Sequence, residues 1–141
     1  MRNTHLFGAA YLAAASILAP SVALPQSAER DEPLAKQFVY CAIVTQYWYE
    51  RMTRPDAPAD SVRYADSTKQ QRDLFYVAAA LVSDGEVVKS ARTAAIAQVT
   101  QELSDMTARG EKHPMVAEGR SCADLFVAKA VPLLKSRSGK Q

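Results

Sequence analysis

The chain of 141 residues has few of the residue types on which catalytic sites depend. It contains five glycines, and none of them forms a glycine-rich phosphate-binding loop. It contains two histidines, and only His113 lies beyond the first 23 residues. His113 could act as a general base, but it stands in a Lys-His-Pro stretch, and no nucleophile motif accompanies it. We therefore interpret His113 as a solvated loop residue and expect a protein that is not an enzyme.

Cysteine is also scarce, which limits metal and cofactor chemistry. The two cysteines, Cys41 and Cys122, form no C-x-x-C pair, and the absence of C-x-x-C-H excludes covalent c-type haem. Structural zinc takes a full tetrahedral set of ligands, and His113 is the only histidine beyond the N-terminus that could join the two sulfurs. The acidic residues around Asp56 and Asp60 lack the spacing and the glycine of an EF-hand. We expect no metal and no cofactor.

No excess of charge of one sign is present. The 17 basic and 15 acidic residues are interspersed, so no basic stripe indicates nucleic-acid binding. Hydrophobic residues make up 48% of the chain, which argues against extensive disorder. The only long apolar stretch, residues 6–18, is shorter than the ~20 residues that a membrane-spanning helix needs.

That stretch has the three-part layout of a secretory signal peptide. Arg2 supplies the positive charge, residues 6–18 form the apolar segment, and Pro20 precedes small residues that end at Ala23. Cleavage after Ala23 is favoured over cleavage after Ala28, and a retained membrane anchor is the alternative. We therefore expect a periplasmic or secreted protein with no stable membrane insertion after cleavage.

In an exported protein, two cysteines without C-x-x-C spacing indicate a structural disulfide between Cys41 and Cys122. Two buried free thiols are the alternative. A disulfide that closes the long loop between Cys41 and Cys122 contributes about 4 kcal/mol to stability in the chain-entropy model.

Hydrophobic residues recur every three or four positions along most of the remaining chain and predict helices. The first helix is expected from Leu34 to about Met52. Two prolines in residues 54–60 end it. Asp60 or Ser61 is a candidate N-cap for a second helix over 62–82, and the polar stretch 66–73 is a place where that helix could break.

The turn signal Asp84-Gly85 separates the second helix from a third, expected over 86–108, with Gly110 directly after its C-cap. The stripe of this helix that should face the core consists of Val88, Ala91, Ala95, Val99, Glu102, Leu103 and Met106. Glu102 and Asp105 otherwise resemble an ordinary exposed helix surface.

A loop over residues 111–119 should lead to a fourth helix, with Ser121 as its N-cap and a kink or an end near residue 131 caused by Pro132. The predicted organisation is a signal peptide (1–23), a flexible lead (24–33), a single helical domain (34–136) and a disordered tail (137–141).

The predicted fold class is therefore all-α, a bundle of about four helices closed by one disulfide. In the simplest up-down-up-down order, the start of the fourth helix should lie beside the end of the first. Cys41 lies early in the first helix, so the disulfide conflicts with that order by roughly two turns, or about 11 Å. Either the first helix starts later or the topology is not a simple bundle.

Aromatic residues gather on the first helix, and four of them form a candidate ligand or partner patch: Tyr40, Tyr47, Trp48 and Tyr49. Because successive residues on a helix diverge by about 100°, three adjacent rings cannot all face one core. Packing in the core is the alternative role for these rings.

Two functions remain open, and no motif assigns the chain to a family. The first is a binding protein without an evident catalytic site, such as an inhibitor, an immunity factor or a chaperone-like module, with another protein outside the cytosol as its partner. The second is a carrier that holds a small apolar ligand near Tyr47 and Trp48. An enzyme with a cryptic site is a further alternative. The sequence leaves the oligomeric state open.

Overall fold

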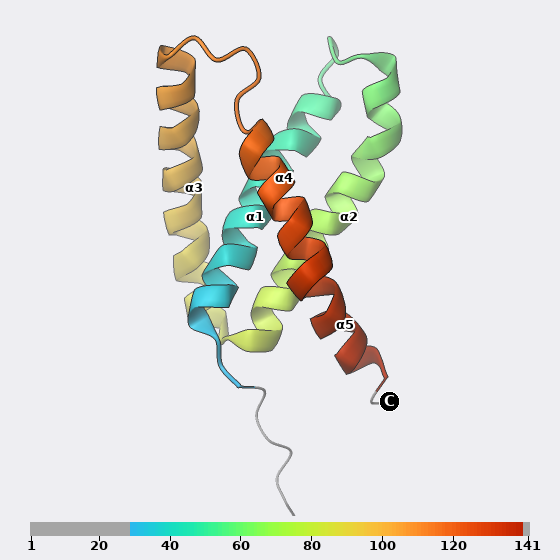
Figure 1. Ribbon diagram of the computed structural model, residues 1–141, viewed down its shortest axis with the longest axis vertical. Helices are drawn as coiled ribbons and strands as arrows, with labels where there is room; N and C mark the ends of the chain where they lie inside the picture. Colours follow the sequence, from blue (N-terminus) through green and yellow to red (C-terminus); the bar gives the residue numbers. More distant parts are fainter. Residues whose placement is uncertain (1–28, 140–141) are drawn as a thin grey trace, which may run out of the picture.

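The computed structural model describes residues 29–139, and in this part of the chain it contains helices and no strand. The elements are α1 (Glu32–Met52), α2 (Ala59–Val82), α3 (Gly85–Ala108), α4 (Val116–Leu125), η1 (Phe126–Ala130) and α5 (Val131–Ser138). Figure 1 shows that α4, η1 and α5 follow one another as a single bent helix. The predicted all-α bundle, closed by a disulfide between Cys41 and Cys122, is confirmed.

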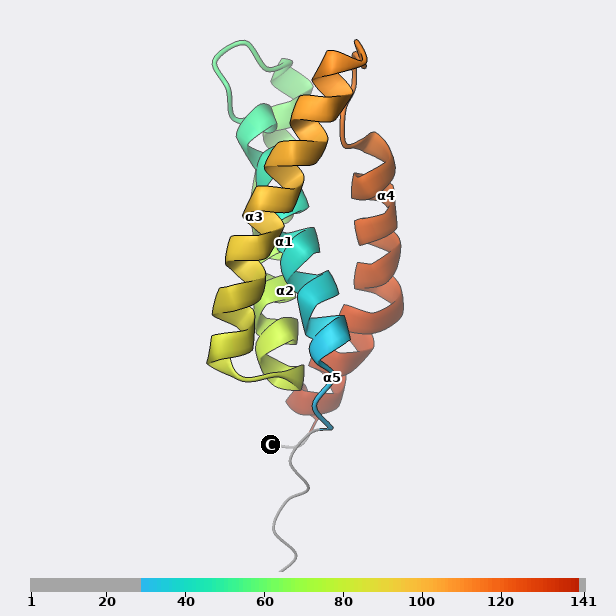
Figure 2. The ribbon, with the colours of Figure 1, turned by 90° about the vertical axis from the view of Figure 1, so that its left-hand side faces the viewer.

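Helix α1 is the centre of the bundle. It packs against α2, α3 and α4, whereas α2 also contacts η1 and α5. The side chains of Phe38 and Phe75 are fully buried where α1 meets α2, with ring centroids 6.1 Å apart. Helix α3 lies mainly against α1, and the view in Figure 2 shows it standing in front of α1 and apart from α4.

The first helix begins at Glu32, two residues earlier than predicted, so the predicted lead over 24–33 is two residues too long. Asp31 caps the helix by accepting a 3.0 Å hydrogen bond from the backbone of Leu34. Pro33 stands in the first turn, where its missing N–H costs no intrahelical bond. The backbone N–H of Asp31 also donates to the carbonyl of Val82, which ties the start of α1 to the end of α2.

Two predictions about α2 were wrong. The residue at its N-cap is Pro58, without a side-chain cap, and neither Asp60 nor Ser61 takes that place. The helix also runs unbroken through 66–73. This stretch contains no glycine or proline, and the hydroxyl of Thr68 donates to the carbonyl of Tyr64 within the helix. Helix α3 begins at Gly85 after an Asp84 cap, and Gly110 adopts φ 76° just beyond its C-cap, as predicted.

The predicted start of the fourth helix was also wrong, because α4 begins at Val116 and Ser121 lies inside it. The N-cap is Met115, a buried residue with φ 66°. The indole N–H of Trp48 donates to the carbonyl of Met115 at 3.3 Å. Because α4 starts earlier than predicted, the disulfide no longer conflicts with an up-down-up-down order of the helices. Trp48 lies seven residues after Cys41, and Met115 lies seven before Cys122, which is the register of two antiparallel helices.

Pro132 does not end the helix. Five residues before α5 form a π-helical turn, in which the backbone N–H of Val131 donates to the carbonyl of Phe126. A proline ring clashes with the carbonyl four residues earlier in an α-helix, and a π-helical turn widens the helix there. The kink that the sequence predicted near residue 131 therefore takes the form of this turn, and α5 continues to Ser138.

The predicted signal peptide (1–23) and most of the predicted lead lie outside the described residues, as do the last two residues of the predicted tail. Within residues 29–139, no helix combines the length and apolar character needed to cross a bilayer.

Candidate binding groove

A groove lies between α2 and α3, with α1 along its base. Ser83 and Asp84 join the two helices, which diverge from this turn on either side of α1 (Figure 1). The groove has a volume of about 910 Å³, and α3 lines it from Gly85 to Leu103. At 1.5 Å per residue this length is ~27 Å. We call this feature the α2–α3 groove.

All three helices contribute apolar side chains to the groove. Ile43 and Tyr47 of α1 and Tyr76 of α2 line it opposite Val99 and Leu103 of α3. Ile96 also lines the groove, with 44% of its surface exposed. An apolar side chain of this size gains free energy when a partner covers it, at about 25 cal/mol per Å² removed from water.

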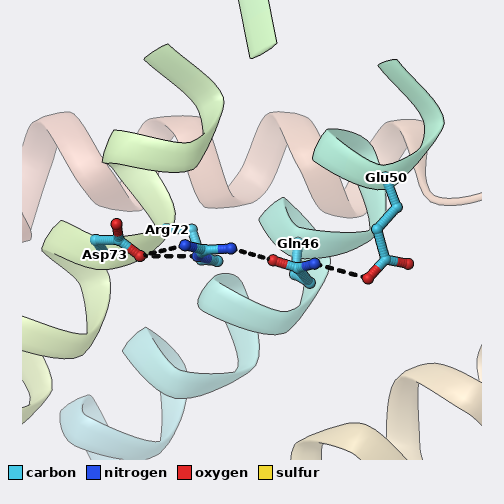
Figure 3. Close-up of polar contacts among 4 residues, drawn as sticks. All are labelled: Gln46, Glu50, Arg72 and Asp73. Carbon is cyan, nitrogen blue, oxygen red and sulfur yellow. Dashed lines mark hydrogen bonds and ion pairs between the residues drawn. The ribbon is translucent and has the colours of Figure 1, made fainter. Parts of the chain in front are cut away.

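A chain of polar contacts crosses from α2 to α1 beside the groove (Figure 3). The guanidinium of Arg72 pairs with Asp73 at 2.6 Å and donates to the amide oxygen of Gln46. The amide nitrogen of Gln46 in turn donates to Glu50 at 2.6 Å. These contacts engage both acidic residues that line the groove. Arg72 also lies 5.9 Å from the ring centroid of Tyr49.

Two basic residues form the lip of the groove on α3. Lys89 and Arg92 line the groove within the first two turns of the helix, and both are exposed. Within residues 29–139, neither of them takes part in an ion pair. After the internal pairing of Arg72, these two side chains are the positive charges that the groove presents to a binding partner.

The four aromatic residues of the predicted patch do not form one surface. Tyr47 lines the α2–α3 groove, and its ring meets the edge of the Trp48 ring at a centroid distance of 5.4 Å. Trp48 itself turns to Met115 at the start of α4. Tyr49 lies near Arg72, and Tyr40 lies between α1 and α3. Of the four, only Tyr47 belongs to the groove.

Tyr40 is partly buried. Its hydroxyl donates a 2.7 Å hydrogen bond to the carboxylate of Glu102, a residue on the predicted inward stripe of α3. Burial raises the pKa of Tyr40 well above its ordinary value, and the hydrogen bond to Glu102 and the nearby charges of Glu102 and Glu118 raise it further. The Tyr40 hydroxyl is therefore protonated at neutral pH, where it donates a hydrogen bond and does not act as a general base.

Tyr40 also lines a second groove, of about 610 Å³, between α1 and α4 with Gln98 of α3 at its edge. The disulfide lies at its base, and Lys36 and Glu118 stand on its walls. Its charged side chains include both signs, so they favour no particular ligand charge.

The other candidate residues, His113 and the possible metal ligands, do not come together to form a site in the described part of the chain. His113 is exposed in the loop between α3 and α4. Within residues 29–139, no three histidine, cysteine, aspartate or glutamate side chains gather in a way that could hold a metal ion. No family model, curated protein or solved structure matches this chain.

Sequence reasoning missed the contribution of α3 to the groove. Ile96 lies off the predicted inward stripe, and it is the large apolar residue of α3 that remains most exposed among residues 29–139. An apolar residue on the polar side of a helix is a signal that could have drawn attention to this face. Lys89 and Arg92 carry no such signal, because exposed basic residues are common on helices.

Proposed function

We propose that the protein is an exported binding protein, and that it takes a segment of another protein into the α2–α3 groove. The observation that carries this proposal is the groove itself: a trough ~27 Å long that is lined by apolar side chains of α1, α2 and α3 and by charged residues. An amphipathic helix that lies in a groove between helices is a common mode of peptide recognition. An interface of this kind buries apolar anchors at its centre and leaves charges at its rim.

Export is supported by the N-terminal pattern of charge, apolar stretch and small residues, and by a disulfide, which persists in oxidising compartments. Mass spectrometry of the protein from the cells that make it is the direct test. Cleavage after Ala23 should give a mature chain that begins at Leu24. A protein that keeps residues 1–23 would contradict the export proposal.

The groove is tested with a photo-crosslinking amino acid at position 96, inside it, and at position 127 as the control. Ile96 and Val127 are both β-branched and exposed, at 44% and 70%, but Val127 lies on η1 and does not line the groove. Irradiation of the producing cells should give a protein adduct at position 96 and none at position 127. Equal labelling at both positions, or none at position 96, would contradict the proposed use of the groove.

A carrier of a small apolar ligand is the second candidate function. Tyr47 and Tyr76 both line the groove, and its volume is within the usual range for ligand pockets. However, such pockets enclose most of the ligand surface, whereas this groove is open along one side. In the crosslinking experiment, a carrier should give a small mass increase at position 96 in place of a protein adduct.

A further inference from the structure

From the charges that line the α2–α3 groove we infer the chemistry of its occupant: an amphipathic helix with acidic residues beside its apolar stripe. This inference rests on the proposed function, because it names the kind of segment that the same groove would bind.

The shape of the groove sets the length and pattern of the occupant. A helix that fills ~27 Å of the groove has about 18 residues, or five turns. Ile43 and Tyr47 of α1 and Ile96 and Leu103 of α3 line the groove, and the two residues of α3 lie about 10 Å apart along their helix. Their partners on an incoming helix would recur every three or four residues, because only those positions share one face.

The charges in the groove favour an acidic occupant. Asp73 pairs with Arg72, so these two charges offset each other within the protein. Glu50 accepts a hydrogen bond from the neutral amide of Gln46 and keeps its charge. Lys89 and Arg92 therefore leave the groove with an excess of one positive charge (two bases against one acid). Lys89 and Arg92 have no acidic partner among the described residues, and both stand on the α3 lip. Carboxylates on the occupant would supply the missing partners, and a basic helix would meet repulsion there.

The direct test compares two labelled synthetic peptides of about 18 residues, the length set by the groove. Both have an alanine background and leucines spaced three and four apart. One carries glutamates beside the leucines, and the other carries lysines at the same positions. Fluorescence anisotropy measures their binding to the purified, disulfide-bonded protein. At low salt the glutamate peptide should bind roughly tenfold more tightly, and this difference should shrink in high salt.

The variant K89E/R92E tests whether the two basic residues of the α3 lip cause the preference for the glutamate peptide. It should reverse the order of the two peptides. The control K129E/K135E makes the same change of charge at two exposed residues outside the groove, and it should keep the preference for the glutamate peptide. Circular dichroism checks that both variants keep their helix content.

Several outcomes would overturn the inference: no binding of either peptide, equal affinity for both, or a preference that survives in K89E/R92E. Vesicles of anionic phospholipid provide a second probe. If K89E/R92E abolishes vesicle binding while neither peptide binds, the occupant is a membrane surface and the inference is wrong. A protein adduct at position 96, combined with no preference for the glutamate peptide, would support the proposed function. It would contradict only the inference that the occupant is acidic.

Discussion

The hydroxyl of Tyr40 on α1 donates a 2.7 Å hydrogen bond to the carboxylate of Glu102 on α3. Within residues 29–139, no other side-chain hydrogen bond joins these two helices. Helix α3 packs mainly on α1, and it forms one wall of the α2–α3 groove. The bond therefore helps to fix the position of that wall.

Substitution of this tyrosine should weaken the attachment of α3. We expect Tyr40→Phe to lower the free energy of unfolding by about 1 kcal/mol, because it removes one partly buried hydrogen bond while keeping the ring. Urea unfolding at neutral pH measures the change. Tyr64→Phe is the control, since Tyr64 is half exposed on α2, and it should change stability by less than about 0.5 kcal/mol. Equal effects of the two substitutions would contradict the role of the bond.

The same tyrosine should make stability fall at high pH. Burial and the bond to Glu102 raise the pKa of Tyr40 in the folded state, whereas in the unfolded chain it should be near the ordinary value of about 10. Above pH ~10 the unfolded state releases a proton that the folded state keeps, so stability decreases as the pH rises. Below that pH the contribution is fully present. The stability difference between the wild type and Tyr40→Phe should therefore narrow above pH ~10, and a constant difference would argue against this linkage.

The turn between α2 and α3 gives a prediction about helix capping. Asp84 caps α3 by accepting from the backbone of Val87 at 3.0 Å, and it also pairs with Arg30 at 3.4 Å. Asp84→Ala should cost about 1 kcal/mol, mainly through the lost cap. Asp60→Ala is the matched control in the first turn of α2, where no side chain caps the helix. It should cost less than about 0.5 kcal/mol through the helix dipole. Thermal unfolding of both variants is the measurement, and a larger loss in Asp60→Ala would contradict the structure.

The helices could be predicted from the sequence because local signals mark most of their ends. Pro55 and Pro58 separate α1 from α2, and Asp84-Gly85 separates α2 from α3. The pairing of the cysteines followed from their number and from the expected compartment.

The start of α4 could not be predicted, because no local signal marks it. Met115 adopts a left-handed conformation without being glycine or asparagine, and its position depends on contacts from elsewhere in the fold. Its backbone N–H donates to the sulfur of Met106, and its carbonyl accepts from Trp48. The groove was missed for a similar reason. The angle at which α2 and α3 diverge is set by packing against α1, and a helical pattern contains no information about that angle.

The close approach of α4 to Trp48 depends on Gly119. A Cβ atom at this position would lie 2.8 Å from the indole nitrogen of Trp48, which is engaged with Met115. We expect Gly119→Ala to destabilise the protein by about 1 kcal/mol, since overpacking outweighs the better helix propensity of alanine. A Cβ atom at Gly85 would meet nothing within 4 Å, so Gly85→Ala should be neutral or slightly stabilising. Chemical unfolding measures the stability of both variants. If Gly119→Ala were stabilised as well as Gly85→Ala, the indole of Trp48 would move aside at no cost in free energy, and the prediction would be wrong.

The disulfide between Cys41 and Cys122 joins the centre of α1 to α4, and both residues are buried. The two cysteines are 81 residues apart in the sequence. Closing a loop of that length restricts the unfolded chain by about 4 kcal/mol in the chain-entropy model. The double variant C41A/C122A should therefore lose stability of this order in urea, and the wild type with reductant should approach the same value.

The covalent link itself is tested by alkylation of the denatured protein without reductant. We expect no labelled thiol, because each cysteine is consumed in the bond. Hydrogen exchange then shows which element the bond holds. In the reduced protein α4 should lose protection before α3, since the bond is the covalent tie between α4 and α1, whereas α3 packs on α1 more extensively than α4 does and without a covalent link. Two labelled cysteines in the untreated protein, or loss of protection in α3 first, would overturn this account of how the bundle is closed.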